Sequence, residues 1–161
     1  MSDQDQLILR LATSSDSDLL LRWRNDPSAR RWFPNSEPIS KNAHELWMNT
    51  QLELSPQLMW IGESSTRRIG SVRITPVDPG RVGSVSVVVD SRYRGSGAGS
   101  QLIHHVGQRA KELGYVELHA QVHMENAASI SIFQRNGYVE FSRDDTPFIW
   151  LAHHLKLPRS N

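Results

Sequence analysis

The segment of the sequence best suited to chemistry is 92–102, RYRGSGAGSQL. Its glycines Gly95, Gly97 and Gly99 precede an amphipathic helical pattern. A glycine-rich turn before a helix can bind a phosphate, because several backbone N–H groups point inward and the helix N-terminus adds partial positive charge. The segment lacks the lysine of a P-loop, and its glycines are spaced differently from a Rossmann fingerprint. The glycines alone therefore leave a phosphate site and a structural turn both open.

Histidine is the other residue type that could carry chemistry. His119 and His123 share one face of an expected strand, but four residues along a strand span about 13 Å, too far for one ion. The pairs 104–105 and 153–154 lack ligand spacing. We therefore expect no metal site, and a neutral histidine could instead act as a base near pH 7.

Alternating and helical hydrophobic patterns predict the elements that position these residues. The expected strands cover 6–12, 58–64, 68–75, 83–90, 115–123, 137–142 and 147–155. The expected helices cover 13–25, 40–53, 100–113 and 126–137, with an irregular segment at 25–40 and a turn at 77–83. This order predicts an α/β protein with a mixed sheet and helices on both faces.

Capping residues support the ends of the expected helices. Ser15 and Asp18 have capping-box spacing, and Ser40 and Asn126 are expected N-caps. The first helix is expected to stop at Asp26-Pro27, and Gly114 and Gly137 to end two later helices.

Composition restricts the class of protein. The 161 residues are 38% hydrophobic and 22% charged with a net charge of +1, which predicts a single domain over 1–161 without a nucleic-acid or membrane surface. The absence of cysteine excludes disulfides and a thiol nucleophile. The N-terminal segment has neither a basic region nor a long apolar run, so we expect a cytoplasmic protein.

Two motifs together resemble the GNAT family of acetyltransferases. Arg94-x-x-Gly97-x-Gly99 fits its [QR]-x-x-G-x-[GA] pattern, and NAASISIFQRNGY at 126–138 is similar to its N-x-x-[SA]-x-x-x-[YF]-x-x-x-G-[FY] segment. The element order is also similar over nearly the whole chain. The resemblance implies a sheet of six to seven strands, about four helices and an N-acetyltransferase that uses acetyl-CoA.

The resemblance also implies a set of residues that contact acetyl-CoA. The backbone of 87–89 would pair with the pantetheine, the amides of 94–100 would bind the pyrophosphate, and α-helical 126–137 would lie beside the pantetheine. The implied cofactor-binding residues are Val87, Val88, Val89, Arg94, Gly95, Ser96, Gly97, Ala98, Gly99, Ser100, Asn126, Phe133 and Arg135. For Arg135, an exposed helix face is an equally good interpretation.

Acetyl transfer needs a base for the amine, a donor for the oxyanion and an acid for the leaving thiolate. The resemblance assigns the donor to a strand amide near Val88. The family's usual tyrosine acid is replaced by Phe133, so Ser129 or a water is left as the acid. Candidate bases are His44, Glu63 and the histidines at 119 and 123, unless a water chain suffices.

The N-terminal half resembles N-acetyltransferases of nucleotide-linked amino sugars. The resemblance is carried by the Trp-Arg-Asn-Asp-Pro run at 23–27 and by His44 with Trp47. Arginines could bind the diphosphate and aromatic rings could stack on uracil or sugar, although the tryptophans could equally be core residues. The implied substrate-binding residues are Arg24, Arg30, Arg31, His44 and Trp47, with Trp32 and Phe33 as further stacking candidates.

Other functions stay open. A similar first helix in ribosomal-protein N-terminal acetyltransferases makes a protein α-amine the second acceptor class, and a polyamine or aminoglycoside is a third. A non-catalytic CoA-binding sensor would also explain the missing tyrosine. The apolar segment 147–155 could join a homodimer interface.

Overall fold

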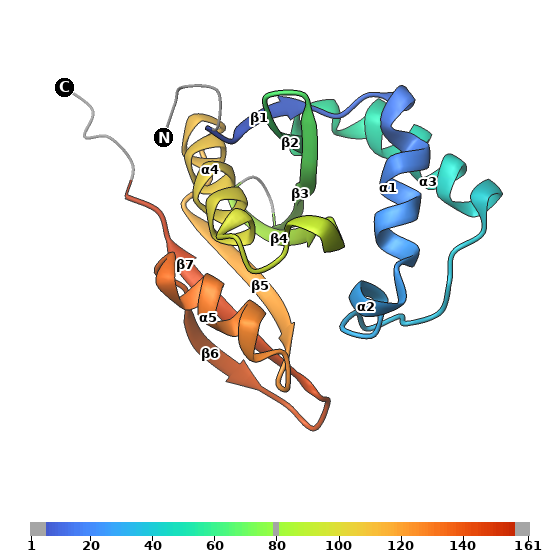
Figure 1. Cartoon of the computed structure of the whole chain (residues 1–161). Coiled ribbons are helices and arrows are strands. Elements are labelled where there is room, and N and C mark those ends of the chain that lie inside the picture. Colours follow the sequence, from blue (N-terminus) through green and yellow to red (C-terminus); the bar gives the residue numbers. More distant parts are fainter. Residues whose placement is uncertain (1–5, 79–80, 157–161) are drawn as a thin grey trace.

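The structure is a computed structural model, which describes residues 6–78 and 81–156. Seven strands form one sheet in the order β1-β2-β3-β4-β5-β7-β6. Every neighbouring pair is antiparallel except β4 and β5, which are parallel. Figure 1 shows α4 and α5 in front of the sheet and α1, α2 and α3 together at the side of its N-terminal strands. The predicted mixed sheet is confirmed.

The strands lie close to the predicted segments. They are β1 (Ile8–Leu11), β2 (Met59–Ser64), β3 (Arg67–Asp78), β4 (Val82–Val89), β5 (Glu117–His123), β6 (Val139–Arg143) and β7 (Phe148–His154). Strand β3 runs three residues past the prediction, with a register shift between Pro76 and Asp78. Pro76 continues the strand because the ladder alternation leaves its position opposite Gly83 without a β3–β4 hydrogen bond.

Five α-helices surround the sheet. They are α1 (Ser17–Asn25), α2 (Pro27–Arg30), α3 (Lys41–Leu54), α4 (Ala98–Glu112) and α5 (Ala127–Arg135), with short 3-10 turns at Ser14–Asp16, Pro56–Leu58 and Ser91–Tyr93. The side chains of Ser40 and Asn126 accept hydrogen bonds from the first turns of α3 and α5, which confirms both caps. Gly114 and Gly137 follow α4 and α5 with φ of 85° and 88°, as their role as terminators requires.

Two local predictions are wrong. The capping box lies two residues before the predicted Ser15, because the amide of Thr13 donates to the carboxylate of Asp16 at 2.8 Å. The irregular segment contains α2, where the carboxylate of Asp26 accepts from the amide of Ser28 and Pro27 occupies the first helical position. The Asp-Pro pair that ends α1 therefore also begins the next turn.

The two faces of the sheet carry separate cores. The larger core holds Val72 and Ile74 of β3 with buried residues of α4, including Leu102 and Val106. The smaller core lies on the opposite face, where Met59 and Ile61 of β2 pack against buried residues of α1 and α3. Trp23 is 4% exposed in this smaller core, which confirms its interpretation as a core residue.

The apolar C-terminal segment is used inside the sheet. Strand β7 lies between β5 and β6, and its residues Phe148, Ile149 and Leu151 are buried. The prediction that this segment is free to form an interface is therefore wrong. The edge strand is β6, on which Val139 and Phe141 are 68% and 55% exposed.

Candidate functional site

The glycine turn is open to solvent above the N-terminus of α4. Gly95 and Gly97 have φ of 75° and 86°, in the left-handed region that glycine tolerates, and no atom lies within 4 Å of a Cβ placed at either residue. Gly97 is the N-cap of α4 and supplies no side chain to cap the helix. The first amides of α4 therefore face open space, which is the arrangement that an anion needs.

Other residues of the turn hold it in place. The guanidinium of Arg94 donates to the carbonyl of Val89 at 3.3 Å, donates to the hydroxyl of Ser28 and lies 3.6 Å from the carboxylate of Asp26. Arg94 thus joins the turn to α2. The hydroxyl of Ser96 donates back to the carbonyl of Tyr93.

Helices α4 and α5 approach closely beside the turn. A Cβ at Gly99 would lie 2.9 Å from Ile132 of α5. The amide of Asn136, after α5, donates to the carbonyl and the hydroxyl of Ser100 at 3.3 and 3.0 Å. Sequence reasoning missed Asn136, which the NAASISIFQRNGY motif does not mark.

Strands β4 and β5 diverge next to this turn. They pair only from Val82 to Ser84 on β4, so the rest of β4 has no neighbour on that side. The amide of Asp90 donates to the carbonyl of Ile69, which makes Gly70 and Val89 a non-hydrogen-bonded pair. By alternation the backbone groups of Val87 and Val89 point into the opening.

The same alternation changes the role expected of Val88. Val88 is opposite Ser71, and this pair is the hydrogen-bonded one, so the Val88 amide is directed to β3. The side chain of Val88 packs beside the smaller core instead. Val87 and Val89 are therefore the better candidates to donate an amide into the opening.

Helix α5 borders the opening on its other side. Asn126 uses its side-chain oxygen to cap the helix, accepting from the amide of Ser129 at 3.1 Å. Ser129 is half-buried, whereas Arg135 is exposed on the last turn. Phe133 is 3% exposed and contacts Tyr138 edge-on at 5.0 Å between centroids, so it belongs to the larger core and is not free to contact a ligand.

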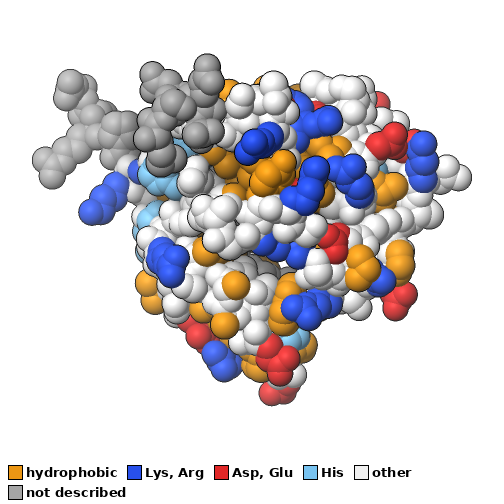
Figure 2. All heavy atoms as spheres, viewed as in Figure 1, with side chains coloured by type: hydrophobic (Ala, Val, Ile, Leu, Met, Phe, Trp, Pro, Cys, Tyr) orange, Lys and Arg blue, Asp and Glu red, His pale blue; other side chains and the backbone are white. Residues whose placement is uncertain are grey.

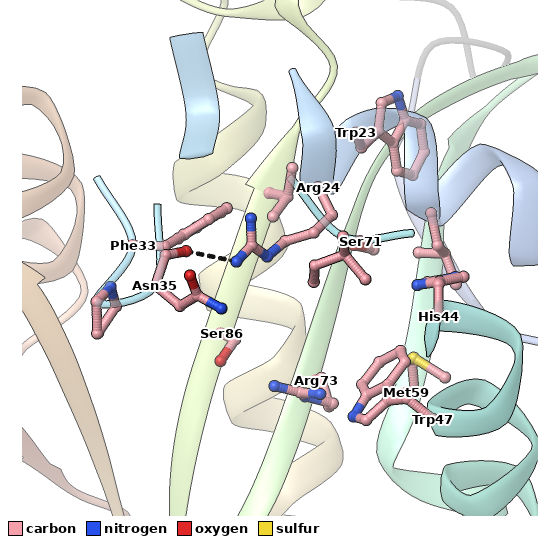
Figure 3. Close-up of a pocket in the computed structure, with 14 residues that line it drawn as sticks. Trp23, Arg24, Phe33, Asn35, His44, Trp47, Met59, Ser71, Arg73 and Ser86 are labelled. Atoms are coloured by element: carbon pink, nitrogen blue, oxygen red, sulfur yellow. Dashed lines mark hydrogen bonds between the residues drawn. The ribbon is translucent and has the colours of Figure 1, made fainter. Parts of the chain in front are cut away.

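A cavity of about 390 Å³ lies on the other face of the sheet, along β3 and β4. Helices α1 and α3, strands β2 to β4 and the segment after α2 form its walls (Figure 3). Its lining is mostly apolar, with a few polar groups: Leu20, Trp23, Arg24, Phe33, Pro34, Asn35, Ile39, His44, Trp47, Met59, Ser71, Arg73, Ser86 and Val88. This size and composition are typical of a small-molecule site.

The segment after α2 is fixed as one wall of the cavity. The side chain of Asn25 donates to the carbonyl of Ile39 and accepts from its amide, both at 2.8 Å. Arg24 donates to the carbonyl of Asn35 at 2.6 Å and lies over the ring of Phe33 (Figure 3). The Trp-Arg-Asn-Asp-Pro run is therefore explained in large part by architecture.

The predicted arginines differ in their positions. Arg24 lines the cavity, and its pKa is lowered by burial and by the positive charge of Arg30. Arg30 is half-buried and donates to the carbonyl of Ser36 at 2.9 Å, outside the cavity lining. Arg31 is exposed and lies over the ring of Trp32.

His44 and Trp47 come together at the α3 wall, with ring centroids 5.5 Å apart. His44 is 4% exposed, and its Nε2 has no hydrogen-bond partner among the described residues. Burial lowers the pKa of His44 below its ordinary 6.5, so the ring is neutral at pH 7. A neutral, buried imidazole at a cavity wall has the properties of a general base.

The other candidate bases lie elsewhere. Glu63 is at the β1–β2 edge, where it accepts from Arg10 at 2.6 Å, and it does not line the cavity. Its selection as a catalytic residue does not agree with this position. His119 lies 2.6 Å from a carboxylate oxygen of Glu117, and His123 contacts the ring of Trp32.

Two structural searches cover the described parts of the chain. Within 6–78 and 81–156, no cluster of three histidine or acidic residues could hold a metal ion. Across the same residues, none of the helices combines the length and the hydrophobicity of a membrane span. Figure 2 shows basic side chains gathered around a hollow in the middle of the face that Figure 1 presents.

Comparison with known sequences gives matches over most of the chain. The family model described as acetyltransferase (GNAT) domain matches residues 6–139. An uncharacterised protein of Methanocaldococcus jannaschii is 24% identical over 86% of this chain and 29% of its own length. The uncharacterised N-acetyltransferase YobR of Bacillus subtilis is 25% identical over 91% of this chain and 57% of its own length. The chain thus spans less than two thirds of both relatives.

Solved structures share the fold. The protein yncA of Salmonella typhimurium, solved with its cofactor acetyl-CoA, has a TM-score of 0.77 at 17% identity, over 97% of this chain and 98% of that chain. Ribosomal-protein-alanine N-acetyltransferase from Brucella melitensis has a TM-score of 0.76 at 22% identity, over 92% of this chain and 99% of that chain. The fold is therefore the one that these proteins have.

Proposed function

The chain belongs to the GNAT acetyltransferase family, and from this premise we propose that it transfers an acetyl group from acetyl-CoA to a primary amine. The observation that carries the proposal is the opening between β4 and β5. On one side of β4 lie the unfilled glycine turn and the backbone groups of Val87 and Val89. On the other face lies the cavity, which shares Ser86 and Val88 with the same strand.

In this arrangement each substrate has its own face of the sheet. The amides at the N-terminus of α4 bind the pyrophosphate of acetyl-CoA, and the opening receives the pantetheine. The acceptor amine sits in the cavity and attacks the thioester carbonyl carbon. A C–N bond forms, the C–S bond breaks, and the amide of Val87 or Val89 donates to the carbonyl oxygen as it gains charge.

Two proton transfers complete the reaction. His44 takes the proton that the amine loses, which its neutral ring and unpartnered Nε2 support. The departing thiolate takes a proton from Ser129 or from a water, since Phe133 has none to give. Replacing Ser129 by Ala should lower turnover more than it weakens acetyl-CoA binding, and unchanged turnover would leave Ser129 as a packing residue.

We propose in addition that the acceptor is an amino group of a nucleotide-linked sugar. Support comes from the sequence resemblance at 23–27 and from three arginines on the wall beside the cavity, Arg24, Arg30 and Arg31. Guanidinium groups suit a diphosphate because they can donate two parallel hydrogen bonds. A protein α-amine, as in the ribosomal-protein acetyltransferases, is the alternative that the substrate screen must include.

Thermal unfolding with acetyl-CoA tests the donor site first. Acetyl-CoA at a hundredfold excess over its Kd should stabilise the protein by about 2.7 kcal/mol. No shift at millimolar acetyl-CoA would overturn the donor assignment. Release of free CoA thiol with UDP-linked amino sugars, N-terminal peptides and polyamines then tests the transfer, and a protein that binds acetyl-CoA but acetylates none of them would be a sensor.

A further inference from the structure

The cavity contains an arginine that sequence reasoning did not select. Arg73 lies on β3, on the face opposite to the buried Val72 and Ile74, and so points to the α1–α3 side. Its guanidinium lies 4.9 Å from the ring centroid of Trp47 (Figure 3). Its Nε atom is buried and has no hydrogen-bond partner among the described residues.

No negative charge balances Arg73. The residues that line the cavity include two arginines and no aspartate or glutamate. Within the described segments, neither Arg73 nor Arg24 takes part in any ion pair. Burial lowers the pKa of Arg73, but a guanidinium keeps its proton inside proteins. A buried cation without a partner is costly, so the cavity lacks a partner that its fold has prepared for.

From this geometry we infer that the acceptor amine carries its own anionic oxygen group, a carboxylate or a phosphate, which pairs with Arg73. The inference rests on the proposed function and names the class of its acceptor. Arg73 stands opposite Ser86, and Ser71, two residues earlier on β3, stands opposite Val88. Residues two apart on a strand are about 7 Å apart, so the anionic group would lie only a few bonds from the amine.

The remaining walls are consistent with a compact acceptor. Trp23, Phe33, Ile39 and Met59 present apolar surface, which suits the hydrocarbon part of such a molecule. The ring of Trp47 holds the guanidinium of Arg73 in place, so little ordering is needed when the anion arrives. A polyamine would be repelled by the same two arginines, which excludes cationic acceptors from the inferred class.

Matched substrates test the inference in the full chain. The panel contains L-amino acids with their amides and decarboxylated amines, and UDP-linked amino sugars with the free amino sugars. We expect the anionic member of each accepted pair to have a kcat/KM at least about tenfold higher, because a charge-assisted hydrogen bond is lost in the neutral member. A preference confined to amino acids assigns a carboxylate, and one confined to UDP-sugars assigns the diphosphate.

Substitutions connect that preference to the residue. Arg73→Met should abolish the preference and Arg73→Lys should keep part of it, while acetyl-CoA still raises the melting temperature of both variants. Arg67→Met is the matched control, because Arg67 is exposed at the start of the same strand. Equal acetylation of neutral and anionic partners by the unmodified protein would overturn the inference and leave the acetyl transfer standing.

A second measurement does not depend on turnover. The side-chain Nε–H resonance of Arg73, assigned by its absence in Arg73→Met, should shift and saturate when sodium phosphate or glycine is added to the protein with CoA. The resonance of Arg67 should shift little. A resonance of Arg73 that does not move at tens of millimolar of either probe would overturn the inference even if no amine in the panel is acetylated.

Discussion

At the scale of the residue, burial sets the charge of His44. The imidazole is desolvated by α1 and α3, so its neutral form is favoured and its pKa falls below 6.5. The nearby carboxylates Glu45 and Asp18 act in the opposite direction but more weakly. The protein therefore keeps a proton acceptor at the cavity over the whole neutral range of pH.

His44→Gln should lower kcat by about 10²–10⁴ if the imidazole accepts the proton of the amine. The rate of the unmodified protein should stay level from pH 8 to about 6.5 and fall only below that value, since the lowered pKa delays protonation. The variant should lose that acidic limb. His104→Gln, at an exposed position of α4, is the control. An unchanged pH profile in His44→Gln would remove the imidazole from the reaction.

The linkage of His44 to stability has the same sign. Its folded pKa lies below the unfolded value, so the unfolded chain binds more protons and the free energy of unfolding falls as the pH drops below 6.5. His105 and His153 have pKa values lowered by burial and add to this dependence.

At the scale of the element, the N-terminus of α4 and its glycine turn carry the donor site. Gly97 and Gly114 flank the same helix with φ of 86° and 85°, and neither has a neighbour within 4 Å of an added Cβ. An alanine thus imposes similar backbone strain at both ends of α4. The two positions differ in whether they face the open turn.

Gly97→Ala and Gly114→Ala should destabilise the protein by similar amounts, about 1 kcal/mol each. Only Gly97→Ala should reduce the melting-temperature shift caused by acetyl-CoA, and Gly97→Trp should abolish it by filling the turn. Thermal unfolding of the three variants with and without acetyl-CoA measures both effects. Equal shifts in Gly97→Trp and Gly114→Ala would show that the turn does not bind acetyl-CoA.

Asn25 tests the wall formed by the segment after α2. Asn25→Ala removes both hydrogen bonds to Ile39 and should lower the free energy of unfolding by about 1–3 kcal/mol. Because that segment lines the cavity, the KM for the acceptor should rise while acetyl-CoA binding stays unchanged. Asn42→Ala, exposed on α3, should change neither quantity. A rise in acetyl-CoA Kd with no change in acceptor KM would contradict this assignment.

Element types and most helix ends could be predicted, because capping residues and hydrophobic periods act locally. Helix α2 was missed because Asp26-Pro27 has two meanings, an end and a beginning. Arg73 was missed because an arginine that alternates with Val72 and Ile74 has the pattern of a solvent-facing residue. Only α1 and α3, which are distant in sequence, turn that face into a cavity wall.

At the scale of the whole molecule, Asp90 joins the two faces of the sheet. It follows β4, accepts from the indole N–H of the buried Trp23 at 2.8 Å and accepts from the Arg92 guanidinium at 2.9 Å. The hydrogen bonds from Arg92 are the largest cause of its pKa lying far below the ordinary 3.8. The carboxylate therefore fixes α1 to the start of the donor turn.

Asp90→Asn should lower the free energy of unfolding by about 1–3 kcal/mol at pH 7. The folded pKa is depressed, so the stability that Asp90 adds is present above pH 3.8 and lost as the pH falls further. The difference between the two proteins should therefore shrink between pH 4 and pH 2, as measured by urea unfolding. A constant difference over that range would show that the charge of Asp90 does not matter, and Asp145→Asn, in the exposed β6–β7 turn, is the control.

The divergence of β4 and β5 also has a mechanical meaning. Only three residue pairs connect β1–β4 to the β5–β7 part of the sheet by a ladder, at the end far from the glycine turn. A donor bound along Val87 and Val89 would occupy the place of the absent ladder, much as an added strand does. Acetyl-CoA would then act as a splint across the sheet, and the slowing of amide hydrogen exchange on binding should be concentrated in β4 and β5.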